Sequence, residues 1–171
     1  MGGTAPGRRW ATTELNHALV LRLASEFQGF ARELHNEAVT TLTAFAAGGR
    51  SDLMESLGRP YEVARHLDRG NAHPGSLGHD FGLFGIQLWG ELIATYPVKA
   101  PAWMRRLDAL NRARNALAHD NVDRLARVDA AGWPMTLRSV RRWRKSLDGL
   151  TKAMDHVTRR GLVRLTGTVP W

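Results

Sequence analysis

The 171-residue sequence contains no cysteine, and this absence removes several kinds of chemistry at once. Without thiols the chain cannot form disulfide bonds, use a thiolate nucleophile or bind zinc through sulfur. The sequence also lacks an apolar run long enough to span a bilayer, because Gln87 and Glu91 interrupt the longest one, residues 81–93. The first residues show neither a signal-peptide pattern nor a myristoylation pattern. We therefore expect a cytoplasmic protein without a membrane partner.

Lysine is scarce, whereas arginine is abundant: only 3 of the 24 basic residues are lysines. The net charge of +8 is distributed unevenly, since residues 1–100 carry 9 basic and 10 acidic side chains, and residues 101–171 carry 15 and 6. A positive C-terminal part suits a polyanionic partner, with nucleic acid as the first candidate. Solubility together with a coding bias toward arginine explains the same excess. Composition alone leaves both interpretations open.

Strand-like alternation is absent, and the three- and four-residue spacing of apolar residues predicts helices throughout. We expect a long helix, one or two short helices, a loop, a buried central helix, a further helix, a polar connector and a closing long helix, at residues 13–47, 52–68, 69–80, 81–95, 101–118, 121–134 and 137–159. The predicted fold class is all-α, an antiparallel helical bundle with two long helices. It forms a single domain over residues 1–171, with a folded core at 13–160 and flexible residues 1–11.

Glycine and proline positions refine the expected helix ends. The Gly48-Gly49 pair ends the first long helix, and Gly161 is the expected cap of the last one. Gly82 and Gly85 lie within the apolar run and are expected to permit close helix approach. Among the prolines, Pro60 is expected to open the second of the short helices, and Pro101 fits the first turn of the helix that follows the central one.

The helix at residues 101–118 has an arginine on its apolar side. On a helical wheel Arg114 falls in the middle of the apolar stripe. A buried unpaired charge costs several kcal/mol, so Arg114 must either reach water or lie in a wet cleft or interface. Asn111, Asn115 and His119 are spaced by four residues and form a polar ridge beside it. This helix therefore carries the predicted functional site.

Arginine, asparagine and histidine together suit the cleavage of a phosphodiester. Arginine offers a planar, permanently charged fork to phosphate oxygens, and asparagine holds an oxygen without charge. Imidazole can take or give a proton at neutral pH. No carboxylate cluster nearby in the sequence suits magnesium, so the nucleophile would be the 2′-hydroxyl of RNA itself. The alternative is structural, because a histidine in the last turn also interacts favourably with the helix dipole.

The run from Arg114 to His119, RNALAH, resembles the signature of the HEPN (higher eukaryote and prokaryote nucleotide-binding) superfamily. In that signature an arginine, often followed directly by a polar residue, precedes a histidine by a short spacer, here of four residues. We extend the resemblance over residues 13–160. It implies a homodimer whose motif helices face each other and form one composite ribonuclease site. Within it Arg114 binds the scissile phosphate, Asn115 orients and His119 transfers protons.

The resemblance implies a metal-independent endoribonuclease that leaves a 2′,3′-cyclic phosphate and acts as a bacterial toxin or antiviral (phage-defence) effector. No cofactor is expected, and RNA, a second copy, and an antitoxin or larger defence complex are the implied partners. Two proton transfers need two histidines, which a two-fold axis supplies. HEPN domains also occur as catalytically inactive dimerisation or RNA-binding modules, which is the alternative function. Members paired with nucleotidyltransferase antitoxins carry a tyrosine where this chain has Asn121, so regulation through that tyrosine is not supported.

The last long helix is basic on the side opposite its apolar stripe. This basic face and one residue of the motif helix are the predicted RNA-binding positions: Arg112, Arg138, Arg141, Arg142 and Lys145. An ordinary solvated face explains the same pattern. Trp143 belongs to the apolar stripe and is therefore not expected to stack on a base.

The histidines outside the motif give no metal-site prediction. His73 and His79 are six residues apart in the expected loop, and we expect no carboxylate beside them. The remaining four, His17, His35, His66 and His156, show no constellation. The predicted number of metal sites is zero.

Overall fold

The computed structural model describes the backbone of residues 6–171 and the side chains from residue 11 onward. This part of the chain folds into seven α-helices and one 3₁₀ helix and contains no strand, which confirms the all-α prediction. The elements, in chain order, are α1 (Pro6–Ala46), α2 (Ser51–Ala64), η1 (His66–Asp68), α3 (Pro74–Gly82), α4 (Leu88–Thr95), α5 (Lys99–Ala118), α6 (Val122–Ala130) and α7 (Leu137–Thr166).

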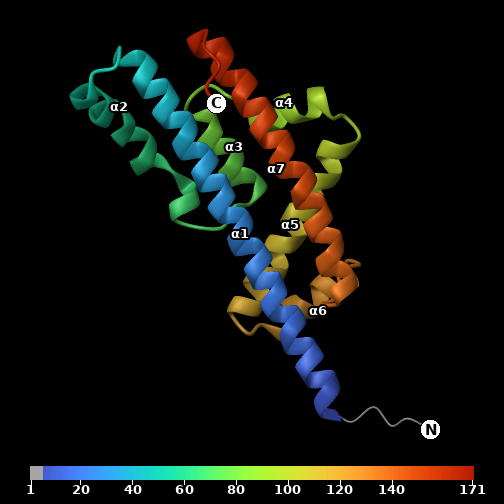
Figure 1. Cartoon of the computed structure of the whole chain (residues 1–171). Coiled ribbons are helices and arrows are strands. Elements are labelled where there is room, and N and C mark those ends of the chain that lie inside the picture. Colours follow the sequence, from blue (N-terminus) through green and yellow to red (C-terminus); the bar gives the residue numbers. More distant parts are fainter. Residues whose placement is uncertain (1–5) are drawn as a thin grey trace.

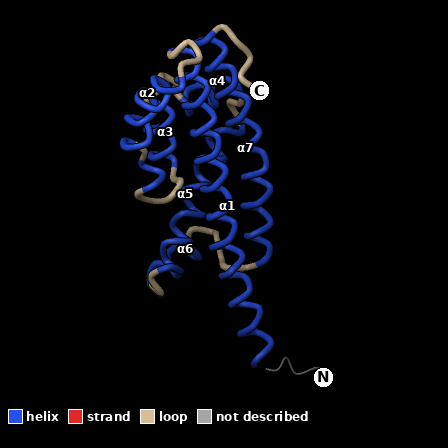
Figure 2. The backbone as a smooth tube through the Cα atoms, turned by 60° about the vertical axis from the view of Figure 1, so that its left-hand side comes forward, coloured by secondary structure: helices blue, strands red, loops and turns tan. Residues whose placement is uncertain are grey.

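The two long helices, α1 and α7, lie side by side and form the spine of the bundle (Figure 1). Figures 1 and 2 both show α2, α3 and α4 at one end of this spine and α6 at the other, with α5 running between them. We call residues 50–95, together with the parts of α1 and α7 that pack against them, the packed end. The C-terminal half of α5, α6 and residues 131–145 form the open end. No described helix is long and apolar enough to cross a membrane.

The core follows the helical stripes expected from the sequence. Phe27 and Leu34 of α1, Leu107 of α5, and Trp143 and Leu150 of α7 are all buried. Trp143 is fully enclosed, so it lies in the core as predicted and offers no face to a base. Apolar burial of this kind supplies most of the stability of a helical bundle.

The prediction of one central helix at residues 81–95 is wrong. The chain instead forms α3 and α4, separated by a turn at residues 83–87 in which Gly85 has a φ of +79°. A Cβ on Gly82 or Gly85 would meet nothing within 4 Å, so neither glycine serves a close helix contact. The expected loop at 69–80 is also too long. His73 and Ser76 form a capping box that begins α3 at Pro74.

The prediction that Gly161 caps the last helix is wrong, because Gly161 is a buried residue within α7. The helix continues to Thr166 and ends at Gly167, whose φ of +71° is left-handed. A Cβ on Gly161 would lie 2.5 Å from Ile86 Cδ1 and 2.7 Å from its Cγ1. The glycine therefore lets the turn between α3 and α4 approach α7 closely. The apolar stripe of α7 continues past Gly161 to the buried Leu162.

Two further expectations concern the N-terminal half. Pro60 lies inside a single helix α2 rather than opening a second one. Gly48 and Gly49, with φ values of +58° and +83°, follow the end of α1 as predicted. The prediction of a flexible N-terminus covered residues 1–11; residues 1–5 lie outside the described part, and the backbone from Pro6 is helical.

Candidate functional site

Helix α5 carries the predicted motif and is anchored by its apolar face. Trp103, Leu107 and Leu110 are buried against the neighbouring helices. Arg114, on the same face one turn later, is half-buried and reaches sideways, where its Nη1 donates to Asn115 Oδ1 at 3.2 Å. The guanidinium of Arg114 therefore lies at the edge of the core with a hydrogen-bond partner, so Arg114 does not have the free-energy cost of a buried, unpaired charge.

Loop 69–73 is tied to the polar ridge of α5 by two asparagines. Buried Asn111 donates through Nδ2 to Ala72 O at 3.1 Å and to Leu107 O at 2.9 Å. Asn115 Oδ1 accepts a second hydrogen bond from Asn71 Nδ2 at 2.5 Å. Asn111 is thus structural, whereas Asn115 joins the loop to Arg114. These three contacts fix the position of the motif side chains relative to α3.

His119 lies just beyond the end of α5. Its backbone N–H caps the helix by donating to Asn115 O and Leu117 O. The imidazole is exposed and has no hydrogen-bond or ion-pair partner among the described residues. Asp120, with a φ of +46°, then turns the chain, and Asn121 caps α6 by accepting from Arg124 N at 2.9 Å. His119 is therefore at the α5–α6 corner, free to meet a ligand from solvent.

A groove of about 450 Å³ runs between α5, α6 and the segment before α7. Four arginines line it, together with one carboxylate, one asparagine and an apolar floor: Arg105, Arg112, Arg124, Arg127, Asp108, Asn115, Ala109, Val128, Ala131 and Trp133. Asp108 lies 2.8 Å from Arg112 and neutralises one charge of the set. We call this site the arginine groove. Its positive lining fits phosphate oxygens, and Asn115 belongs both to the groove and to the motif.

The basic face of α7 lies at the same open end. Arg138, Arg141 and Lys145 are exposed, and none of them forms an ion pair with an acidic side chain in the described chain. Arg142 lies over the ring of Trp133, with its guanidinium carbon 4.4 Å from the ring centroid. Trp133 in turn stacks on Trp143 at 5.1 Å and 15°. Arg142 therefore packs against the wall of the arginine groove as well as facing solvent.

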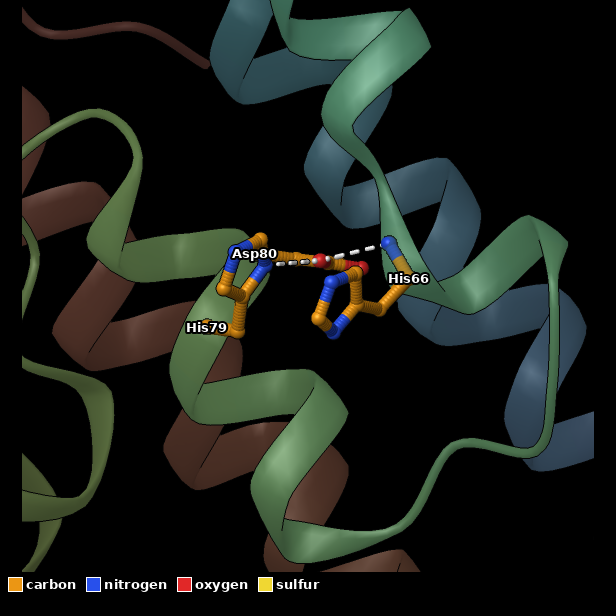
Figure 3. A group of neighbouring side chains, drawn as sticks. All are labelled: His66, His79 and Asp80. Carbon is orange, nitrogen blue, oxygen red and sulfur yellow. Dashed lines mark hydrogen bonds and ion pairs between the residues drawn. The ribbon is translucent and has the colours of Figure 1, made fainter.

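A histidine cluster at the packed end was missed by the sequence analysis. His66 and His79 stack face to face with ring centroids 3.6 Å apart, and His79 Nδ1 lies 3.0 Å from Asp80 Oδ1 (Figure 3). The expectations that His79 lacks a carboxylate and that His66 belongs to no constellation are therefore wrong. The adjacency of His79 and Asp80 was visible in the sequence. The contribution of His66 was not, because it comes from another element.

His35 is buried close to this cluster, between Phe81 and Phe84, and neither ring nitrogen has a hydrogen-bond partner in the described chain. Burial, together with the positive charge of Arg65, lowers the pKa of His35 to about 4. The negative charges of Asp80 and Asp68 act in the opposite direction and do not offset burial. His35 is therefore a neutral core side chain.

The structure brings together only part of the predicted site. Arg114 and Asn115 are in contact, and Arg112 lines the groove beside Asn115, whereas no described contact links His119 to Arg114 within one chain. Sequence analysis missed Arg124 and Arg127, because α6 was interpreted as a polar connector. The asparagine cap three residues before Arg124 could have identified that helix and its groove-facing arginines.

Comparison with known proteins found no matching family model, no matching curated protein and no matching solved structure.

Proposed function

We propose that this chain binds RNA in the arginine groove and cleaves it with the motif at the end of α5, as a metal-independent endoribonuclease. The observation that carries the proposal is the position of Asn115. Its side chain lines the arginine groove and also accepts a hydrogen bond from Arg114. A phosphodiester bound by the groove arginines would therefore lie beside the motif side chains. The HEPN resemblance of the same residues also supports this proposal.

The proposed reaction is transesterification. The 2′-oxygen attacks the adjacent phosphorus, an O2′–P bond forms, and the bond from phosphorus to the 5′-oxygen breaks. One base removes the 2′-hydroxyl proton and one acid protonates the leaving 5′-oxygen, so the products are a 2′,3′-cyclic phosphate and a 5′-hydroxyl. Arg114 stabilises the charge on the phosphate oxygens, and Asn115 orients Arg114. His119 performs one proton transfer, and His119 of a second copy performs the other.

The biological role that we propose is that of a toxin or phage-defence effector, as the HEPN resemblance implies. Expression of the wild-type chain in bacteria should then arrest growth, and His119→Ala should relieve the arrest. Relief in the absence of any RNA cleavage by the wild-type protein would refute this role.

The proposal is tested with untagged protein and mixed RNA in excess chelator. Wild-type protein should produce cyclic-phosphate ends, and His119→Ala and Arg114→Ala should each lower the rate by at least about 100-fold, the usual contribution of such groups. His156→Ala, at an exposed histidine of α7, is the matched control and should retain full activity. Equal thermal stability of the variants excludes unfolding. Strict dependence on added magnesium would refute the mechanism.

A second candidate function is a non-catalytic RNA-binding or dimerisation module. It is favoured by the isolation of the His119 imidazole, which no described side chain orients. Catalytic histidines are commonly held by a third group. This alternative predicts that His119→Ala leaves RNA affinity and every cellular effect unchanged and that wild-type protein produces no cyclic-phosphate ends. Growth arrest that is rescued by His119→Ala would exclude it.

A further inference from the structure

The junction between η1 and α3 gathers three potential metal-binding side chains, His66, His79 and Asp80 (Figure 3). One ligand atom of each lies within 4.8 Å of the others. The two imidazole planes are inclined by only 4°. His66 and His79 are exposed, whereas Asp80 is fully buried behind them. The cluster is therefore open to solvent on the imidazole side alone.

Asp80 already has its hydrogen bonds. Its Oδ1 accepts from His66 N at 2.8 Å, and its Oδ2 accepts from Leu67 N at 2.9 Å. The third partner is His79 Nδ1, at 3.0 Å from Oδ1. Because the carboxylate oxygens of Asp80 act as acceptors in this set of contacts, the contact with His79 places the proton on Nδ1 and leaves the lone pair on Nε2 free. Asp80 thus fixes the tautomer and the orientation of the His79 ring.

We propose that His66 and His79 together bind one zinc ion, with Asp80 holding the His79 ring from behind. A carboxylate that accepts a hydrogen bond from the other nitrogen of a ligating histidine is the usual support of such a ligand. Imidazole nitrogen suits zinc and its neighbours in the transition series, whereas magnesium and calcium prefer oxygen ligands. Water completes the coordination, because the imidazole side faces solvent.

Binding requires a small movement of the His66 ring. Parallel stacked rings direct their lone pairs alongside each other rather than to one point. A tetrahedral zinc ion holds two nitrogens roughly 3.3 Å apart, given Zn–N distances of about 2.0–2.1 Å. The two ring centroids are 3.6 Å apart, so a tilt of the His66 ring can bring one of its nitrogens and His79 Nε2 to a common zinc ion. The His66 ring is exposed and forms no hydrogen bond in the described chain, so its stacking on the His79 ring is what a tilt has to overcome.

Zinc at this site would brace the loop that holds the motif helix. Residues 67–78 connect the two ligands, and within them Asn71 and Ala72 are hydrogen-bonded to Asn115 and Asn111 of α5. A ligand that binds only the folded arrangement stabilises it by mass action. The proposal does not depend on ribonuclease activity, since its readouts are metal binding and stability.

The experiment uses the untagged full chain, freed of metal with chelator and then dialysed. Titration with Zn²⁺ should show one site per chain, and saturation should raise the Tm by about 5 °C. His66→Gln and His79→Gln should each weaken Zn²⁺ binding by at least about tenfold, since loss of a mere supporting partner already costs about 10–100-fold. His156→Gln, an exposed histidine on α7, is the control and should bind zinc like the wild type.

Nuclear magnetic resonance spectra provide a second readout that does not depend on stability. Addition of Zn²⁺ should shift the ring signals of His66 and His79 together and leave those of His156 unchanged. Failure to bind stoichiometric zinc would overturn the proposal. Wild-type affinity in either His66→Gln or His79→Gln would also overturn it, because the site needs both rings.

Discussion

The two ends of the bundle use their polar side chains in opposite ways. At the packed end, Phe81 and Ile86 are fully buried and even His35 is enclosed without a hydrogen-bond partner in the described chain. At the open end, four arginines surround a groove of about 450 Å³, and their side chains meet solvent rather than the core. Burial therefore dominates one end and charge the other.

This contrast separates stability from binding. The packed end fixes where α5 lies, through the loop hydrogen bonds of Asn111 and Asn115, and the open end presents the charges that a phosphate chain would meet. Substitutions at the packed end should change the free energy of unfolding and leave RNA affinity unaltered. Substitutions in the arginine groove should lower RNA affinity and leave the free energy of unfolding unaltered. Each prediction below tests one side of this separation.

The largest expected effect is the loss of stability in acid caused by His35. Its pKa of about 4 in the folded chain is below the ordinary value of 6.5, so the unfolded chain binds the proton first. The stabilisation is complete above about pH 6.5 and decreases as the pH falls toward 4, by about 3 kcal/mol. Chemical denaturation of the wild type and of His35→Leu across this pH range measures the difference.

His35→Leu should therefore flatten the acid side of the stability profile, because leucine has no proton to gain. Phe27→Leu, at a buried position of α1 without a titratable group, is the control and should leave the pH dependence of stability unchanged. Parallel profiles of wild type and His35→Leu would contradict the assignment of a neutral, buried imidazole.

A smaller effect is expected at Gly161. A Cβ there would lie 2.5 Å from Ile86 Cδ1, and overpacking of this kind costs about 1–3 kcal/mol. The better helix propensity of alanine returns about 1 kcal/mol, so Gly161→Ala should lower the free energy of unfolding by about 1 kcal/mol. Gly29→Ala, where a Cβ meets nothing within 4 Å, should instead raise it by about 1 kcal/mol.

The stability difference between these two alanine variants is measured by urea denaturation. Ile86→Val removes the Cδ1 atom that Gly161→Ala would strike, so the double variant should lose less than the two single variants combined. Simple additivity would show that the clash is relieved elsewhere.

The basic face of α7 should affect RNA binding far more than stability, because the replacements remove only the contact of Arg142 with the Trp133 ring from the folded chain. Replacing Arg138, Arg142 and Lys145 by glutamine should flatten the plot of log K against log salt by about two units for single strands, from about 0.7 per lost contact. Cleavage within the bound complex should hardly change, because Arg114 and His119 remain. Filter binding at several salt concentrations measures the slope. An unchanged slope would reduce this face to a solubility feature.

Replacing two arginines of the arginine groove should change the slope of the salt plot less than the three replacements on α7 do. It should also lower the cleavage rate. Arg124→Gln combined with Arg127→Gln should flatten the salt plot by about 1.4 units. The cleavage rate at low RNA concentration should fall with the affinity. The charge-matched control replaces Arg50 and Arg59, which are exposed at the α2 side, by glutamine. Equal losses in the two double variants would show that only net charge matters and would remove the distinction between the ends.

Much of the architecture could be predicted from the sequence, because apolar spacing at three and four residues reports directly on buried helix faces. The break between α3 and α4 could not. Residues 81–95 are apolar nearly throughout, so the pattern does not reveal where the helix stops, and the turn depends on the burial of Ile86 against Gly161. Gly161 itself was misinterpreted, because a glycine that caps a helix and one that admits a neighbour are alike in sequence.

Only those contacts of the candidate site that lie within one helix could be predicted from the sequence. Arg114 and Asn115 are adjacent, and their contact follows from one helix. The bond from Asn71 to Asn115 joins residues 44 apart in the sequence, and the stack of His66 on His79 depends on the fold of two elements. No helical wheel predicts such contacts. The wheel did predict a ridge of Asn111 and Asn115, but it could not show that Asn111 would be buried as a structural link.

The most direct test of the central claim uses two oligonucleotides of one sequence, one of RNA and one in which every 2′-hydroxyl is replaced by hydrogen. Both are incubated with wild-type protein in excess chelator. We predict that the two bind with similar affinity, because contacts between groove arginines and phosphate would not involve the 2′-hydroxyl. Only the RNA should be cut, with 2′,3′-cyclic phosphate ends. Cleavage of the deoxy oligonucleotide, or RNA products without cyclic ends, would contradict the account.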